Sequence, residues 1–145
     1  MIMFTQGDLF AAPADIRVNP VNCVGVMGAG LALAFRQRHP AMFRAYRQAC
    51  AAGEVRPGRL HIWRPPWVIN LPTKRHWRDP SRLDDVAAGL DALREYLTPL
   101  GPLTVALPAL GCGRGGLDWP RVRDLVEAKL NGLPAIVHVY APPAS

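Results

Sequence analysis

The stretch from Val18 to Phe35, VNPVNCVGVMGAGLALAF, joins a strand pattern, a glycine-rich turn and the beginning of a helix within eighteen residues. The residues from Ile16 to Val21 are rich in apolar β-branched side chains, which predicts a short buried strand. Three glycines follow, and apolar residues then recur at helical spacing. Because the unpaired N–H groups and the dipole at a helix start favour anions, this turn predicts a phosphate site.

A second glycine turn, Ala109–Gly116, follows another core strand pattern at Val105–Leu107. Strand patterns alternate with helix patterns, which predicts an α/β fold whose mixed or mostly parallel sheet carries helices on both sides. Ligands of such sheets bind beyond the carboxyl ends of the strands, where both turns are placed. Two glycine loops at one edge suggest a diphosphate with a sugar at each end. The remaining strands are expected at 2–5, 60–63, 67–71 and 136–140, and the helices up to His39, from Pro40 to Gly53, from Ser81 to Leu97 and from Asp118 to Gly132.

Length and composition predict one domain over residues 1–145, since 50% of the residues are hydrophobic and no linker divides them. The sequence has neither a leader-like start nor an apolar run of about 18 residues, so we expect no membrane segment and no export. Its three cysteines are an odd number without a close pair, which fits a reducing cytoplasm. The histidines are scattered and no cluster has ligand spacing, so we expect no metal.

The charge balance favours a polyanionic partner. Lys and Arg number 17 against 11 Asp and Glu, for a net charge of +6. A lineage that prefers arginine would explain the excess equally well. Only two of the cations are lysines, Lys74 and Lys129, so composition alone does not account for a lysine at either position.

The segment Pro72–Pro80, PTKRHWRDP, is predicted to be a loop because of its prolines. It holds four potentially cationic groups and the indole of Trp77. Arginines bind phosphates and an exposed indole stacks on unpaired bases, which suits DNA, although Trp77 could equally be a buried anchor. After the loop, Ser81 is expected to cap the next helix, with Asp84 at the capping-box position.

Two common nucleotide-binding patterns are excluded by the turns. The first turn reads G-x-x-G-x-G, which fails the dinucleotide fingerprint G-x-G-x-x-G. Neither turn ends in Lys-Ser or Lys-Thr, as a P-loop does. A structural turn is the simpler explanation for either glycine loop alone, but the pair together with Asp8 favours a ligand site.

Four motifs together resemble a macrodomain: QGDLF at 6–10, NPVNCVGVMGAG at 19–30, LPTKRHWR at 71–78 and ALGCGRGGLDW at 109–119. The resemblance covers nearly the whole chain and implies a three-layer α/β/α sandwich with a central mixed sheet. More specifically, the chain resembles the DarG branch, whose macrodomains remove ADP-ribose from thymidine in DNA. The common macrodomain hydrolases differ, because an Asn-rich run and three consecutive glycines stand in their first loop.

The resemblance also extends to the terminal ADP-ribose protein glycohydrolases. Those enzymes carry an acidic residue in the second loop where this chain has Gly115–Gly116. The resemblance therefore leaves the acid/base partner of the reaction open, as a side chain or as water.

The resemblance implies an ADP-ribose site and no bound cofactor. Asp8 would accept hydrogen bonds from the adenine amine with help from the backbone of Leu9, although Asp8 could merely cap its turn. Asn22 would orient the distal ribose, and Tyr140 would flank the adenine unless it is simply packed in the core. Two segments would wrap the diphosphate, one from each side: Val26, Met27, Gly28, Ala29 and Gly30, and Gly111, Cys112, Gly113, Arg114, Gly115 and Gly116. Leu31 and Thr73 complete the implied ADP-ribose set.

Lys74 would be the catalytic residue, by analogy with the lysine at this place in the branch, with Asn22 beside it. Chemistry supports the choice, since a neutral amine can attack the anomeric carbon, open the ribose and form a Schiff base that water resolves. A surface lysine that pairs with DNA phosphate is the simpler alternative. The neighbours Arg75, His76, Trp77 and Arg78 are predicted to contact DNA, in single-stranded or flipped-out form because a stacked base would not reach a closed cleft.

The predicted function is therefore hydrolytic removal of ADP-ribose from single-stranded DNA. Two alternatives stay open: a reader that holds ADP-ribose without cleaving it, and a hydrolase of ADP-ribosylated protein or O-acetyl-ADP-ribose. The resemblance further implies partnership with a DarT-type toxin, and we expect a monomer in the cytoplasm.

Overall fold

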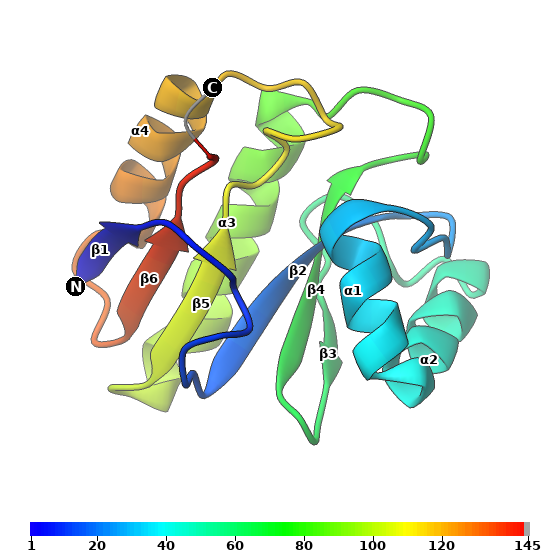
Figure 1. Ribbon diagram of the computed structural model, residues 1–145, viewed down its shortest axis with the longest axis horizontal. Coiled ribbons are helices and arrows are strands. Elements are labelled where there is room, and N and C mark those ends of the chain that lie inside the picture. The colour runs from blue at the N-terminus through cyan, green and yellow to red at the C-terminus, as the bar shows by residue number, and fades with distance from the viewer. Residues whose placement is uncertain (144–145) are drawn as a thin grey trace.

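The computed structural model describes residues 1–143 and places all of its strands in one six-stranded sheet (Figure 1). The strand order is β1-β6-β5-β2-β4-β3. Every neighbouring pair is parallel except β3 and β4, so the sheet is mixed as predicted. The strands are β1 (Ile2–Thr5), β2 (Ile16–Asn22), β3 (His61–Trp63), β4 (Val68–Lys74), β5 (Thr104–Pro108) and β6 (Ile136–Tyr140).

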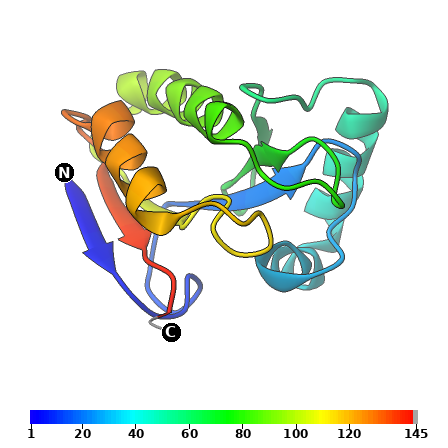
Figure 2. The same ribbon diagram turned by 90° about the horizontal axis from the view of Figure 1, so that it is seen from above.

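Helices cover both faces of the sheet and make the predicted three-layer sandwich (Figures 1 and 2). On one face lie α3 (Leu83–Leu97), which a short 3₁₀ turn extends to Leu100, and α4 (Trp119–Leu130). The other face carries α1 (Gly30–Arg38) and α2 (Pro40–Ala51). None of the helices in residues 1–143 is both long enough and apolar enough to cross a membrane.

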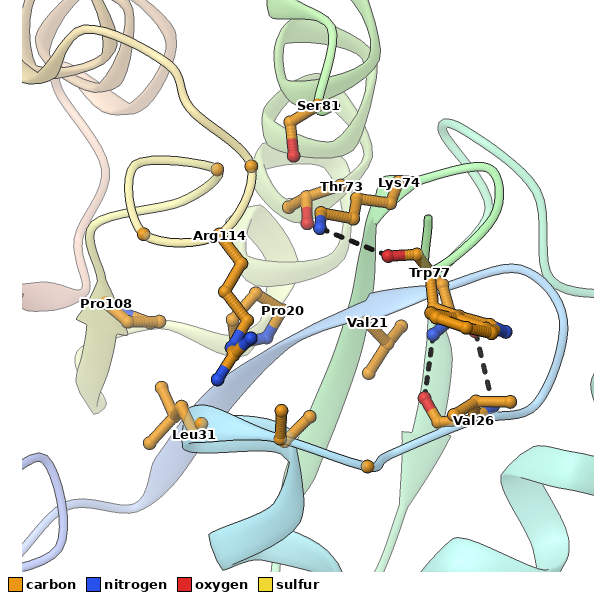
Figure 3. Close-up of a pocket in the computed structure, with 18 of the residues that line it drawn as sticks. Pro20, Val21, Val26, Leu31, Thr73, Lys74, Trp77, Ser81, Pro108 and Arg114 are labelled. Atoms are coloured by element: carbon orange, nitrogen blue, oxygen red, sulfur yellow. Dashed lines mark hydrogen bonds between the residues drawn. The ribbon is translucent and has the colours of Figure 1, made fainter. Parts of the chain in front are cut away.

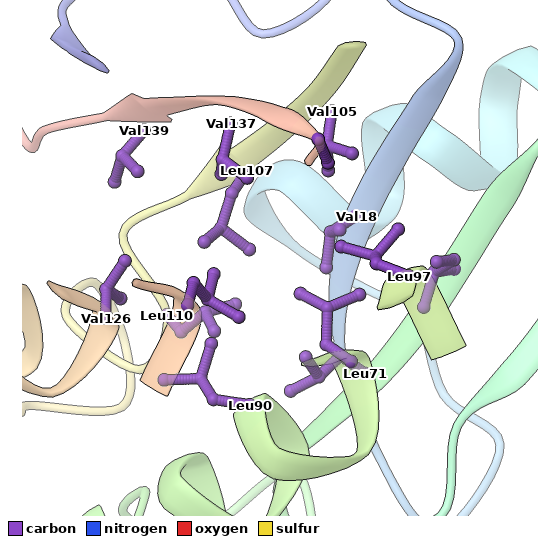
Figure 4. Close-up of a cluster of buried hydrophobic side chains, with 14 of the residues drawn as sticks. Val18, Leu71, Leu90, Leu97, Val105, Leu107, Leu110, Val126, Val137 and Val139 are labelled. Carbon is purple, nitrogen blue, oxygen red and sulfur yellow. The ribbon is translucent and has the colours of Figure 1, made fainter. Parts of the chain in front are cut away.

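The face under α3 and α4 is an aliphatic core (Figure 4). Successive side chains of a strand point to opposite faces, so Val105 and Leu107 of β5 lie in this core while Ala106 lies in the other. The apolar residues of α3 recur every three to four residues and meet these strands, as the periodicity predicted: Leu83, Val86, Leu90, Leu93 and Leu97. Burial of this stripe supplies most of the apolar contact that holds α3 on the sheet.

The face under α1 and α2 also buries polar groups. Asn19 on β2 and Asn70 on β4 are register partners and fully buried. The Asn19 Nδ2 donates to Asn70 Oδ1 at 3.0 Å, and Asn70 Nδ2 lies 2.9 Å from Nδ1 of His61. Burial lowers the pKa of His61, which favours the neutral ring that accepts this hydrogen bond.

Two expectations from the sequence are wrong, and the first concerns the predicted loop Pro72–Pro80. Its first three residues belong to β4, which therefore ends at Lys74 rather than at Leu71. A shift in register pairs Val21 with Pro72 and Asn22 with Lys74, and such a bulge accommodates a proline, which has no N–H for the ladder.

The second correction concerns Ser81, which does not cap α3. The N-cap residue of that helix is Arg82, and it makes no side-chain capping hydrogen bond. The Ser81 N–H donates instead to the carbonyl oxygen of Gly115 at 3.0 Å. A contact with a remote loop therefore overrides the local capping pattern.

Candidate functional site

A cavity of about 600 Å³ opens at the carboxyl ends of β2, β4 and β5 (Figure 3). These three strands are adjacent and parallel, so their ends meet at one edge, where ligands of α/β sheets bind. The volume suits a small-molecule ligand. The lining residues come from the three strand ends, both glycine loops and the loop after β4: Pro20, Val21, Asn22, Val26, Gly28, Ala29, Gly30, Leu31, Ala32, Thr73, Lys74, Trp77, Ser81, Pro108, Ala109, Gly111, Gly113, Arg114 and Gly115.

Asn22 holds the first glycine loop in shape. Its Oδ1 accepts hydrogen bonds from the backbone N–H groups of Val24 at 3.1 Å and Val26 at 3.3 Å. Its Nδ2 donates to the carbonyl oxygen of Val26 at 2.7 Å. The amide is therefore committed largely to the loop, and the second N–H of Nδ2 has no partner within residues 1–143.

Tyr46 on α2 holds Asn22 in place through its hydroxyl group. Its hydroxyl lies 2.7 Å from the carbonyl oxygen of Asn22 and 2.9 Å from its Oδ1, so the two acceptors share one proton. The ring is fully buried, and burial raises the pKa of Tyr46 above its ordinary value of 10.0. The phenol consequently stays a proton donor, and the first loop is anchored to α2.

The second glycine loop is shaped by close packing against Ser81, and its internal hydrogen bonds are mostly between backbone groups. At Gly111 the backbone has φ +72°, which favours glycine. An added Cβ at Gly115 would lie 2.5 Å from the carbonyl oxygen of Gly111 and would collide with the Ser81 hydroxyl. The loop therefore folds against Ser81 only because residues 111 and 115 have no side chain.

Ser81 places a buried hydroxyl at this cavity without a protein partner. The residue is 6% exposed, and its Oγ has no hydrogen-bond partner within residues 1–143. In Figure 3 the hydroxyl points toward the side chains of Thr73 and Lys74. A buried unpaired hydroxyl costs about 1–3 kcal/mol, so its position at the cavity favours a ligand or water as the missing partner.

Lys74 stands at the end of β4 and lines the cavity with its neighbour Thr73. Its Nζ lies 3.4 Å from the carbonyl oxygen of Trp77, a long contact that leaves two ammonium protons free for a ligand. From the opposite loop, Arg114 extends across the cavity toward Leu31 at the start of α1 (Figure 3). The cavity therefore presents two cationic side chains on different walls.

The predicted DNA-contacting residues of the loop after Lys74 differ in whether they line the cavity. Trp77 lines the cavity and is 46% exposed, so it is not a buried anchor. The Arg78 guanidinium stacks over its ring at 4.6 Å, and the His76 ring centroid lies 5.4 Å away. Arg75 instead is not among the lining residues and makes two hydrogen bonds to the buried Asp85, at 3.1 and 3.2 Å.

Several predicted ligand residues lie outside the cavity wall. Asp8 is exposed, and its Oδ1 accepts a hydrogen bond from the N–H of Phe10 at 2.9 Å, as a turn-capping carboxylate does. Leu9 and Met27 are buried in the core beside α1 and α2, and Tyr140 packs against the same cluster. Neither Cys112 nor Gly116 is among the lining residues.

The lining also includes residues that the sequence interpretation did not select. These are Ser81, Ala32 in the first turn of α1, and four residues at strand ends: Pro20, Val21, Pro108 and Ala109. The strand ends could have been found, because Val21 and Leu107 close predicted strands at the ligand-binding edge. Ser81 could not, because its local pattern is that of a helix cap.

The three cysteines lie outside the cavity wall, and their thiols are poor nucleophiles. Burial raises the pKa of Cys23 and of Cys112 to about 11 each, and it also raises that of Cys50. All three are therefore protonated near neutral pH. In residues 1–143 no three His, Cys, Asp or Glu side chains come close enough together to hold a metal ion. The primary amine of Lys74 is the strongest candidate nucleophile of the cavity wall.

The chain matches the family model of the Macro domain over residues 18–126. It is 44% identical to a DNA ADP-ribosyl glycohydrolase of Mycobacterium tuberculosis, over 99% of this chain and 43% of that protein. The chain therefore spans about two fifths of the length of the curated relatives it matches.

Two solved structures have the same fold. The macrodomain of Thermus aquaticus DarG superposes with a TM-score of 0.92 and 41% identity, covering 98% of this chain and 99% of that one. A structure titled Thermosipho africanus DarTG in complex with ADP-ribose gives a TM-score of 0.91 and 31% identity, over 97% of this chain and 41% of that one. The chain belongs to the macrodomain family, and within it to the DarG type.

Proposed function

We propose that this chain is a hydrolase that removes ADP-ribose from thymidine bases of single-stranded DNA. The observation that carries the proposal is the position of the Lys74 side chain, in the wall of a cavity flanked by two glycine loops. The name of the Mycobacterium tuberculosis relative, a DNA ADP-ribosyl glycohydrolase, supports the same reaction. The complex of Thermosipho africanus DarTG with ADP-ribose supports the ligand.

The diphosphate is proposed to lie between the two loops. The first turn of α1 has neither a side-chain cap nor an acidic residue, so its N–H groups remain available to an anion. Arg114 adds a guanidinium from the other wall. The adenosine end then points toward Asp8 and Tyr140, and the distal ribose toward Lys74 and the free N–H of Asn22.

Lys74 is proposed to act as the nucleophile. The Lys74 ammonium first loses one proton to solvent. The neutral amine then forms a bond to C1 of the distal ribose while the bond from C1 to the base nitrogen breaks, and the released base takes up a proton. Opening of the ribose ring gives a Schiff base between Nζ and C1. Water adds to that carbon, the amine leaves, and free ADP-ribose and free Lys74 result. The reaction consumes water and needs no cofactor.

The Ser81 hydroxyl is proposed to bind the substrate at the same end of the cavity. It is oriented toward Lys74 and Thr73 and has no hydrogen-bond partner in the described part of the chain, residues 1–143. A hydroxyl of the distal ribose, or the attacking water, would supply the missing hydrogen bond. Trp77 would stack on the extruded base at the rim, which its exposure permits.

The test is release of ADP-ribose from a thymidine-ADP-ribosylated single-stranded oligonucleotide, followed by borohydride trapping. Wild-type protein is expected to release ADP-ribose and to form a reduced lysyl adduct. Lys74→Ala should abolish both while leaving ADP-ribose binding, measured by calorimetry, within about threefold. Lys129→Ala is the matched control, because Lys129 is the other lysine of the chain and, from α4, pairs with Asp91 of α3 at 2.9 Å.

Three results would contradict the proposal, each in a different way. Release from modified protein but not from DNA would favour a protein hydrolase. Binding without release by wild-type protein would favour a reader of ADP-ribose. Full release by Lys74→Arg, which keeps the charge but not the nucleophilic amine, would reduce Lys74 to a phosphate-pairing cation.

A DarT-type toxin is proposed as the source of the modified DNA and as a partner. The Thermosipho africanus structure, titled DarTG, supports this pairing. Co-purification of this chain with a DarT-type toxin, compared with an unrelated macrodomain, tests whether the pairing includes direct contact.

A further inference from the structure

The segment that contains α1 and α2 is purely cationic. Residues 16–53 include five arginines and no aspartate or glutamate. The four arginines on the two helices are exposed, and none pairs with a carboxylate within residues 1–143. His39 between the helices has a lowered pKa, caused first by burial and then by Arg38 and Arg17. Positive potential therefore concentrates over this pair of helices.

Two of these arginines are held in place by the same aromatic ring. The guanidinium of Arg36 lies 4.3 Å from the centroid of Phe43, and that of Arg47 lies 5.5 Å from it. Phe43 is 8% exposed and therefore fixed in the core. A guanidinium stacked on a ring keeps its in-plane N–H groups free for phosphate oxygens. We call Arg36, Phe43 and Arg47 the arginine face.

The arginine face adjoins the wall of the cavity. The Cγ of Arg47 lies 3.2 Å from the position a Cβ would take at Gly25, within the first glycine loop. Val24 and Val26 of that loop are exposed, and Val26 lines the cavity together with Trp77. One surface therefore leads from Trp77 across the loop to Arg47 and on to Arg36.

We infer that the DNA strand that flanks the modified nucleotide runs over the first glycine loop and binds the arginine face through its phosphates. This inference rests on the proposed function, since a modified base in the cavity leaves the backbone on either side outside it. The exposed valines and Trp77 offer apolar contact to unstacked bases, and the guanidiniums follow at the point where the strand leaves the rim. Because both guanidiniums are assigned to phosphates, which carry no sequence information, we expect no preference for a base sequence.

The test compares a long and a minimal substrate. Arg36→Gln/Arg47→Gln is expected to lower kcat/KM for an ADP-ribosylated oligonucleotide of about 20 nucleotides by about tenfold or more at low salt. The slope of log affinity against log salt should fall by about 1.4, since each lost phosphate contact on a single strand contributes about 0.7. Turnover of ADP-ribosylated thymidine mononucleoside should stay unchanged.

Arg121→Gln/Arg123→Gln is the matched control. It removes the same charge from α4, on the opposite face of the sheet, where both side chains are exposed. It is expected to leave the salt slope for the oligonucleotide within about 0.3 of wild type. An equal loss in this control would show that net charge in general, and not the arginine face, causes the weaker binding.

Two further outcomes would overturn the inference. Unchanged oligonucleotide kinetics in Arg36→Gln/Arg47→Gln would place the strand elsewhere, and an equal loss on the mononucleoside would make these arginines structural. If wild-type protein released ADP-ribose from neither substrate, the proposed function would fail. Fluorescence anisotropy with an unmodified single-stranded oligonucleotide would then still test whether the arginine face binds DNA. The inference requires that Arg36→Gln/Arg47→Gln bind this oligonucleotide more weakly than the α4 control does.

Discussion

The two glycine loops enclose the same cavity but are held in place by different physical means. The first loop, residues 23–29, is tied by hydrogen bonds from Asn22, which in turn is held by Tyr46. The second loop, residues 109–117, depends on shape, since Gly111 and Gly115 pack directly on Ser81. The first loop should therefore weaken gradually as bonds are removed, whereas the second should fail at a single added methyl group.

The layers beneath the loops show the same contrast. Buried asparagines and a histidine accompany the aromatic side chains on the α1–α2 face, while the α3–α4 face is aliphatic. Hydrogen bonds specify position at a modest net free energy, and aliphatic packing supplies stability with less directional control. Directional hydrogen bonds thus fix one wall of the cavity, and steric packing fixes the other.

The largest effect is expected at Gly115. Gly115→Ala places a Cβ 2.5 Å from the carbonyl oxygen of Gly111 and 2.8 Å from the Cβ of Ser81. Such overpacking should lower the free energy of unfolding by about 1–3 kcal/mol and displace the second loop. Thermal unfolding and ADP-ribose calorimetry measure the two consequences, and affinity should fall more than tenfold.

Gly113→Ala is the control for this change within the same loop. A Cβ at Gly113 meets nothing within 4 Å, and the backbone φ there is not positive. Its free energy of unfolding should stay within about 0.5 kcal/mol of wild type. Equal destabilisation by both variants would contradict the steric account of the second loop.

A smaller loss is expected from the support of the first loop. Tyr46→Phe removes the hydroxyl that lies 2.7 Å from the Asn22 carbonyl oxygen, which should cost about 0.5–1.5 kcal/mol. Hydrogen exchange of the amides of residues 22–26 should accelerate. Tyr96→Phe is the matched control: it also loses a hydroxyl, which accepts from Trp67 Nε1 at 3.0 Å on the other side of the sheet. Faster hydrogen exchange of residues 22–26 in both variants would contradict the specific support of the first loop by Tyr46.

Ser81→Ala should separate binding from stability. Removal of a buried unpaired hydroxyl should leave the free energy of unfolding unchanged or raise it by up to about 1 kcal/mol. ADP-ribose affinity should nevertheless fall by about three- to tenfold, since one ligand hydrogen bond contributes about 0.5–1.5 kcal/mol. An affinity equal to that of wild type would show that the hydroxyl has no ligand partner.

The smallest effect concerns pH and the polar layer beneath the first loop. The pKa of His61 is lowered from 6.5 by burial, so the unfolded chain binds this proton more tightly than the folded protein. The associated stability is complete above about pH 6.5 and is lost as the pH falls below it toward the folded-state pKa. Urea unfolding between about pH 5 and pH 8 should show this decline, and His61→Gln should flatten it. An undiminished slope would assign the decline to other groups, His39 among them.

Much of the fold follows from local sequence. The strand and helix patterns predicted which edge of the sheet carries the site, because side-chain periodicity reports which face of an element is buried. The two glycine turns placed both loops beyond the carboxyl ends of β2 and β5 in the same way. The resemblance to macrodomains supplied the family, which the comparisons confirm.

The sequence by itself determined the alternating elements, the two glycine loops and a lysine placed next to a strand end. Only the tertiary structure decided that β4 continues through Pro72 to Lys74, that Asn22 holds its own loop, and that Ser81 faces the cavity instead of capping α3. The physical reason is range. Periodicity and turn chemistry act over a few residues, whereas Ser81 is positioned by a loop distant in the chain, whose glycines leave the space that its hydroxyl occupies.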